Sequence, residues 1–517
     1  MNISTDPWIP VVWSDGRPGV VNLCEAFQKG RDIADLALRP HERVAVMRLL
    51  VCVAQAALNG PRDRLEYQSA PARLSSAASS YLQQWSKAFE LLGEGQRFLQ
   101  VPALRSSPAR SSDGEGSPIS KLDLTLASGN NSTLFDNAGG AERRFELNQA
   151  VLMLLTFQCF SPGGRIGTAV WGGAPTSGNG SSEHAPCVAG NLLHAVVRRE
   201  NLLDTVCCNL MTKEQAARFF GSDVWGKPVW EQMPSGSDDA AAVANATSTY
   251  LGRLLPLSRA IRLEDDGQSA IIANGLKFPT FPEWREPTST AVIRRVKDVP
   301  ERRVLRASVQ KAAWRELHSI AVLTADHNSN GGPAALERVV GGSAFDLWVG
   351  GLVTSQAKLV DAVESVLHVP AEMLQETGQR IYEEGVRWAE RRASHLTRAI
   401  TAYHSALGDK IDRPELKDRR FQVWGRATGQ YWTDVEQNVA SLLQAAINPG
   451  EVGLTRDWYA TEWGRSTSRA ACSAYSNACP HSTPQQMRAF ALGMNALHGK
   501  AVRDTSEQPE NDQEVAA

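Results

Sequence analysis

The sequence predicts an α+β protein in which a large mixed α/β domain precedes a C-terminal four-helix bundle. Its 517 residues are too many for one ordinary core. Short apolar runs and turn residues alternate with helical stretches up to about residue 365, and long helical stripes follow. We therefore expect a mixed domain over residues 1–365, a bundle over 370–502 and a disordered, acidic tail over 503–517.

The N-terminal part combines a hairpin with a core helix. Residues 8–13 form an apolar run, 14–19 supply turn residues, and 20–23 resume the apolar pattern, as in a β-hairpin. Pro40 opens a helix that runs to about Leu58, just before a Gly-Pro pair. Its apolar stripe consists of Val44, Met47, Val51, Ala54 and Leu58.

The bundle is predicted from apolar residues that recur at alternating spacings of three and four. The three stripes are Ala389, Ala393, Leu396, Ile400, Tyr403 and Leu407; Trp432, Val435, Val439, Leu442 and Ala446; and Met487, Phe490, Met494, Leu497 and Ala501. A fourth helix is expected over residues 457–476, which completes four antiparallel helices.

Three polar, glycine-rich stretches lie close together in the first domain, at residues 104–119, 128–140 and 161–182. A helix over 146–159 separates the second stretch from the third, and residues 268–360 are strand-rich. Long loops of this kind in compact domains are commonly functional or disordered.

The sequence contains no motif of a known enzyme class. It has neither a P-loop nor a GxSxG motif, and His41-Glu42 is followed by Ala45 where a zinc protease needs its second histidine. None of the eight cysteines has CxxC spacing, so we expect no metal, no cofactor and no catalytic residue. A mechanism assembled from distant parts of the chain stays open. With neither a signal peptide nor an apolar run long enough to span a membrane, the cytoplasm is the expected location.

Residues 294–315 form the most basic stretch. Eight basic residues face two acidic ones, so the formal net charge is +6 over these 22 residues, in a chain whose net charge is -2. Phosphate contact is the functional interpretation, and a solvated surface is the alternative. The candidate phosphate contacts are Arg294, Arg295, Lys297, Arg302, Arg303 and Arg306.

Residues 347–357 combine an apolar strand, a bend at Gly350-Gly351 and a polar tip. By pattern alone, an ordinary strand and turn is the simpler interpretation.

Several segments together resemble the CasA family, the large subunit of the type I-E CRISPR Cascade complex. Their order follows the family's over most of the chain. The segments are 6–11 (DPWIPV), 49–52 (LLVC), Ser128-Gly129 followed by Phe135 and Asn137, 157–173, 190–210 and 347–357.

The resemblance implies a subunit that lies near the 5′ end of the guide RNA and binds double-stranded target DNA. It reads the protospacer-adjacent motif from the minor groove, starts strand separation with a wedge and helps to recruit a helicase–nuclease, while its bundle contacts other Cascade subunits. A purely structural scaffold and an unrecognised hydrolase or nuclease are the rival interpretations.

The resemblance also assigns site residues. Gln356 would be the wedge, and Gly163 and Gly164 would belong to a glycine loop at the DNA. One described family member has a minor-groove lysine before a strand that ends in Asn-Gly-Leu, where this chain has Gln268. Glutamine can hydrogen-bond minor-groove acceptors but brings no charge. The remaining assignments are Ser355 and Ala357 beside the wedge, and Asn131, Phe135 and Asn137 in a loop that docks on partners.

Overall fold

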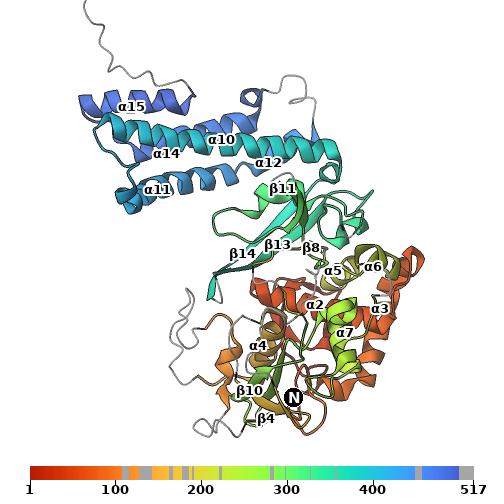
Figure 1. Cartoon of the computed structure of the whole chain (residues 1–517). Helices are drawn as coiled ribbons and strands as arrows, with labels where there is room; N and C mark the ends of the chain where they lie inside the picture. Colours follow the sequence, from red (N-terminus) through yellow and green to blue (C-terminus); the bar gives the residue numbers. More distant parts are fainter. Residues whose placement is uncertain are drawn as a thin grey trace, which may run out of the picture. The chain divides into compact units, whose positions relative to one another are not determined.

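The computed structural model divides the chain into two compact units, Met1–Ala371 and Glu372–Ala517 (Figure 1). The first contains helices and small sheets and the second contains helices, so the predicted α+β class is confirmed. The structure describes residues 1–107, 116–126, 143–161, 167–176, 186–188, 191–220, 224–279, 285–296, 299–326, 328–355, 358–448 and 457–499.

The first unit begins with a three-stranded antiparallel sheet in the order β2-β1-β3. β1 (Ile9–Trp13) pairs with β2 (Pro18–Val21), which confirms the predicted hairpin, and β3 (Ile33–Leu36) pairs with the other edge of β1. Asn22 caps the short helix α1 (Leu23–Gln28) through its side chain, which accepts from the backbone N–H of Glu25.

The predicted core helix is α2 (Pro40–Leu58), with the expected bounds. Most of its circumference is buried rather than one stripe, because α3 (Arg64–Gln84), α4 (Leu147–Phe160) and β13 all pack against it. The helix ends at Asn59, whose φ of 45° is left-handed. Even its charged Arg48 is buried, in an ion pair with Glu286.

Four further antiparallel sheets complete the strands of the first unit, in the orders β5-β10-β9, β4-β6-β7, β11-β12 and β14-β13-β8. Their strands are β4 (Arg105–Ser106), β5 (Ser117–Pro118), β6 (Ala169–Trp171), β7 (Ala174–Pro175), β8 (His194–Arg198), β9 (Arg259–Leu263), β10 (Ser269–Asn274), β11 (Ala291–Val296), β12 (Val299–Val304), β13 (Phe345–Ser355) and β14 (Lys358–Val369). Shorter helices connect them: α5 (Leu202–Cys208), α6 (Lys213–Phe220), α7 (Ala240–Ser248), α8 (Tyr250–Leu254) and α9 (Leu317–Ile320).

The second unit packs its helices around the long α10. Its elements are α10 (Glu376–Ala406), α11 (Lys417–Glu436), α12 (Val439–Ile447), α14 (Glu462–Ala478) and α15 (Pro484–Leu497). Most of the stripe on α10 is confirmed, because Ala389, Leu396, Ile400 and Tyr403 are buried. Ala393 is half-buried, and Leu407 follows the last helical residue. The second predicted stripe spans two helices, since α11 ends at Glu436 and α12 begins at Val439.

The third predicted stripe lies partly beside the buried face of α15: Leu497 is buried as predicted, and Phe490 and Met494 are half-buried. Met487 is 57% exposed, and the buried residues are Ala489, Gly493 and Leu497. The reason is close helix packing: a Cβ at Gly493 would overlap the hydroxyl of Tyr475 and lie 2.7 Å from the carbonyl oxygen of Ala399 on α10. Small residues therefore define this contact, and a pattern of large apolar residues does not reveal it. Ala501 and the predicted tail lie outside the described residues.

Candidate nucleic-acid interface

The hairpin formed by β13 and β14 carries the predicted wedge. The two strands pair from Phe345 with Val369 to Ser355 with Lys358, and Gln356 and Ala357 connect them in the sequence. These two residues lie outside the described part, as does the side chain of Ser355. β8 pairs with β13 only between Asp346 and Gly350, so the last five residues of β13 pair with β14 alone.

The predicted bend at Gly350-Gly351 is wrong, because β13 runs through both glycines without a shift in register. A Cβ at Gly350 would lie 2.6 Å from the ring of Trp348, and one at Gly351 would overlap the carbonyl oxygen of Leu192. The glycines therefore allow close packing on both faces of a straight strand. The irregularity lies nearer the tip, where the register shifts between Val353 and Thr354.

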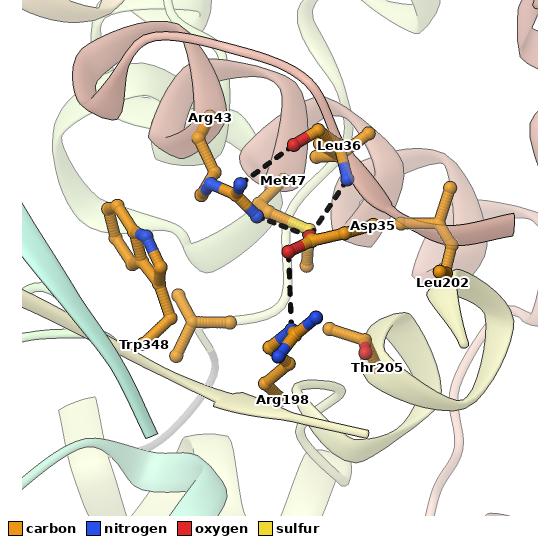
Figure 2. Close-up of a pocket in the computed structure, with 10 residues that line it drawn as sticks. Asp35, Leu36, Arg43, Met47, Arg198, Leu202, Thr205 and Trp348 are labelled. Carbon is orange, nitrogen blue, oxygen red and sulfur yellow. Dashed lines mark hydrogen bonds and ion pairs between the residues drawn. The ribbon is translucent and has the colours of Figure 1, made fainter. Parts of the chain in front are cut away.

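A polar joint fixes the base of this hairpin to the N-terminal sheet. Figure 2 shows Asp35 of β3 between two guanidinium groups, those of Arg43 on α2 and Arg198 on β8. Arg43 also donates to the carbonyl oxygen of Leu36 at 2.7 Å, and its guanidinium carbon lies 5.5 Å from the centroid of the Trp348 ring. The indole N–H of Trp348 donates to Glu364 of β14 at 2.7 Å.

The side chains of this joint come from four strands and one helix. They are those of Asp35, Arg43, Arg198, Trp348 and Glu364. Periodicity did not single them out, because a single charged residue on a strand or helix normally indicates a solvated face. The available signal was a charged residue, such as Arg43 or Arg48, within the largely apolar residues 43–58.

The basic stretch folds partly into the two-stranded sheet β11-β12, which divides its charges between two faces. Arg294 and Arg303 are exposed on one face, and Glu301 pairs with Arg303 at 2.8 Å and lies opposite Arg294 in the register. Arg302 is half-buried on the other face. Arg306, after β12, is exposed.

Arg302 is half-buried and acts on the buried Arg285. Burial and then the charge of Arg302 lower the pKa of Arg285 to about 10. Of the six predicted phosphate contacts, Arg294, Arg303 and Arg306 are therefore the described ones that lie exposed. Lys297 and the side chain of Arg295 lie outside the described residues.

Gln268 lies in the turn between β9 and β10, and both groups of its side-chain amide are already bonded. Its Oε1 accepts from the backbone N–H of Phe145 and its Nε2 donates to the carbonyl oxygen of Phe145, each at 2.9 Å. Contact with a base edge would require these bonds to be exchanged. The other predicted loop residues, Gly163, Gly164, Asn131, Phe135 and Asn137, lie outside the described residues.

Within the described ranges, no cluster of three or more His, Cys, Asp or Glu side chains could hold a metal ion. In the same part of the chain, no helix is both long and apolar enough to cross a membrane.

Comparisons with known proteins support the resemblance seen in the sequence. The family model of CRISPR-associated protein Cse1 matches residues 2–474. The CasA/Cse1 protein of Thermus thermophilus is 28% identical over 436 residues, which cover 80% of this chain and 79% of that protein.

Solved structures show the same fold. The structure of Thermus thermophilus CasA (Cse1) matches with a TM-score of 0.71 at 21% identity, covering 96% of this chain and 98% of that one. A chain of a CRISPR RNA-guided surveillance complex matches with a TM-score of 0.69 at 15% identity, covering 96% and 99%. Because the family model spans most of its length, this chain belongs to the Cse1 family of CRISPR-associated proteins.

Proposed function

We propose that this chain is the large subunit of an RNA-guided DNA surveillance complex in the cytoplasm. In this role it recognises the protospacer-adjacent motif in target duplex and starts strand separation. It works beside other Cascade subunits with their guide RNA and helps to recruit a helicase–nuclease. Family membership and the likeness to a chain of a surveillance complex support the assignment.

The hairpin β13–β14 is the observation that carries the proposal. Its last five β13 residues extend past the end of β8, which amounts to about 17 Å of two-stranded ribbon. Gln356 and Ala357 connect the two strands in the sequence, directly after Ser355. A rigid ribbon with a small polar end is suited to enter between base pairs, and strand exchange with a guide is so nearly balanced that a local contact can start it.

The exposed arginines near β11–β12 complete the proposed interface. Arg294, Arg303 and Arg306 would contact phosphates, which positions the duplex without reading its sequence. Gly163 and Gly164 would approach the bases, and Asn131, Phe135 and Asn137 would dock the chain on its partners. No step of this function requires catalysis by the chain itself.

Reconstitution tests the proposal. A complex prepared with and without this chain is titrated with duplexes that share a guide-matched target and differ only in the presence of the motif. The expected result is that the chain confers a preference for the motif-bearing duplex. Equal binding of both duplexes by the complete complex would contradict motif recognition and favour a purely structural scaffold. Metal-dependent cleavage of DNA by the isolated chain would favour a nuclease.

A further inference from the structure

Gln268 connects separate segments at the turn between β9 and β10. Its amide exchanges two hydrogen bonds with the backbone of Phe145, each at 2.9 Å. Its own carbonyl oxygen accepts from the backbone N–H of Ile119 at 2.8 Å. The side chain thus reproduces the two-bond exchange that a neighbouring antiparallel strand would make with Phe145.

The turn that presents Gln268 is held by its own bonds. The carboxylate of Asp266 accepts from the backbone N–H groups of Gln268 and Ser269, at 2.8 and 3.1 Å. These bonds, the one from Gln268 first, lower the pKa of Asp266. Gly267 has a φ of +63°, and a Cβ there would lie 2.7 Å from Cδ2 of Leu147 at the start of α4. The left-handed backbone favours glycine at this position.

β10 and its turn contact three segments of the chain, at β5, Phe145 and Gly167. β5 pairs with the start of β10, Phe145 is bonded to Gln268, and a Cβ on Gly167 would lie 3.7 Å from the carbonyl oxygen of Ile272. These contacts come directly after residues 108–115, 127–142 and 162–166 in the chain. Three separate segments of the sequence therefore contact β10 and its turn, and two of them border residues that the sequence assigns to partner docking or to DNA contact.

We propose that Gln268 is a positioning residue, which fastens the chain after residues 127–142 to the strand that also carries the other two attachments. The Gln268 amide could bind a base edge only by releasing its two hydrogen bonds to Phe145. Their loss would leave the N–H and the carbonyl oxygen of Phe145 without these hydrogen bonds. The consequence for docking rests on the proposed function, because that function assigns residues 131–137 to partner contact. The attachment itself does not depend on it.

Limited proteolysis of the full chain tests the attachment. Arg143 and Arg144 are exposed and directly precede Phe145, so trypsin cleavage after Arg144 requires local opening of the Phe145 bonds. Mass spectrometry follows the appearance of the new terminus at Phe145. Gln268→Ala should increase this cleavage rate about tenfold, since two neutral hydrogen bonds are lost.

Two further variants make the result specific. Gln268→Glu keeps the acceptor and loses the donor, so its rate should be intermediate, and it decides the question if the alanine variant fails to fold. Gln28→Ala removes an amide that donates to Ser79 elsewhere in the first unit, at 3.0 Å, and should leave the rate unchanged. Wild-type cleavage rates in both Gln268 variants would overturn the proposal.

Assembly and DNA-binding measurements distinguish a positioning role of Gln268 from a role in reading the motif. Each variant is titrated into complex that lacks this chain, and the saturated complex is then offered duplexes with and without the motif. Positioning predicts that Gln268→Ala docks more weakly, while the ratio of the two duplex affinities stays that of wild type. Normal docking with a lost ratio would identify Gln268 as a reader instead. If the wild-type complex shows no motif preference, the proposed function fails, and the proteolysis result still decides the attachment.

Discussion

Gly493 and Gly425 both lie inside helices of the second unit, yet their surroundings differ. A Cβ at Gly493 would overlap the Tyr475 hydroxyl, whereas nothing lies within 4 Å of a Cβ at Gly425. Gly493→Ala should lower the free energy of unfolding by about 1–3 kcal/mol through overpacking. Gly425→Ala should raise it by up to about 1 kcal/mol, because alanine is the better helix former. Denaturant unfolding followed by circular dichroism measures both, and shifts in the same direction would contradict the packing described for α15.

His194 makes the stability of the first unit depend on pH. Burial, and then the charge of Arg48, lower its pKa from 6.5 to about 3. Its Nδ1 lies 2.8 Å from the hydroxyl of Thr288, and no hydrogen bond to Nε2 is described. Between these two pKa values the unfolded chain binds the proton that the folded chain rejects, so stability falls as the pH drops below about 6.5.

The slope from one such histidine is about 1.4 kcal/mol per pH unit. His194→Gln should therefore reduce the loss of unfolding free energy between pH 6.5 and about 5. Part of that loss should remain in the variant, because burial also lowers the pKa of His41, to about 4. Denaturant titrations at several pH values provide the measurement. Identical slopes in the variant and wild type would contradict the burial of His194 as a neutral ring.

Among the elements, the β13–β14 hairpin depends on the joint around Arg43. Its guanidinium pairs with Asp35, donates to Leu36 and stacks on Trp348, a combination that a lysine ammonium cannot make. Arg43→Lys should lower the free energy of unfolding by about 1–2 kcal/mol. The matched control is Arg62→Lys, at an exposed pair with Glu66, where no measurable change is expected because water screens the pair. Equal effects of the two variants on the denaturation midpoint would show that the joint contributes nothing beyond an ordinary surface pair.

The arginines of the basic stretch around β11 and β12 differ in their exposure, and this difference can be tested. Arg306 is exposed and Arg302 is half-buried, so they should differ in their contribution to DNA binding. Arg306→Gln should weaken binding to all duplexes about equally and reduce the slope of log affinity against log salt by about 0.9. Arg17→Gln, at an exposed pair with Asp15, serves as the control for charge alone. An unchanged slope for Arg306→Gln would assign this stretch to the solvated surface.

For the molecule as a whole, local pattern predicted the elements better than the contacts between them. The bounds of α2 and the first hairpin followed from periodicity and from turn residues, which are properties of neighbouring residues. The bond between Gln268 and Phe145 joins positions 123 apart, and Arg48 and Glu286 are 238 apart, so no local period relates them. The displaced stripe on α15 has a similar origin, since Gly493 is explained only by the helices that pack against it.

The candidate site shows the same difference between local pattern and contacts distant in the sequence. The segment proposed as the wedge was found through a family resemblance. Its strand was placed correctly, but Gly350 and Gly351 allow close packing and do not bend the strand. The joint around Asp35 and the attachment made by Gln268 required the fold.

In the proposed function, Gln356, which lies between β13 and β14 in the sequence, starts the separation of target strands. Gln356→Ala, in the assembled complex, is compared with wild type on intact target duplex and on a duplex already unpaired beside the motif, with Gln84→Ala as an exposed control. The variant should lose about 1.4 kcal/mol of binding free energy on the intact duplex, the value of one base-pair step, and little on the unpaired one. Equal losses on the two substrates would contradict the account.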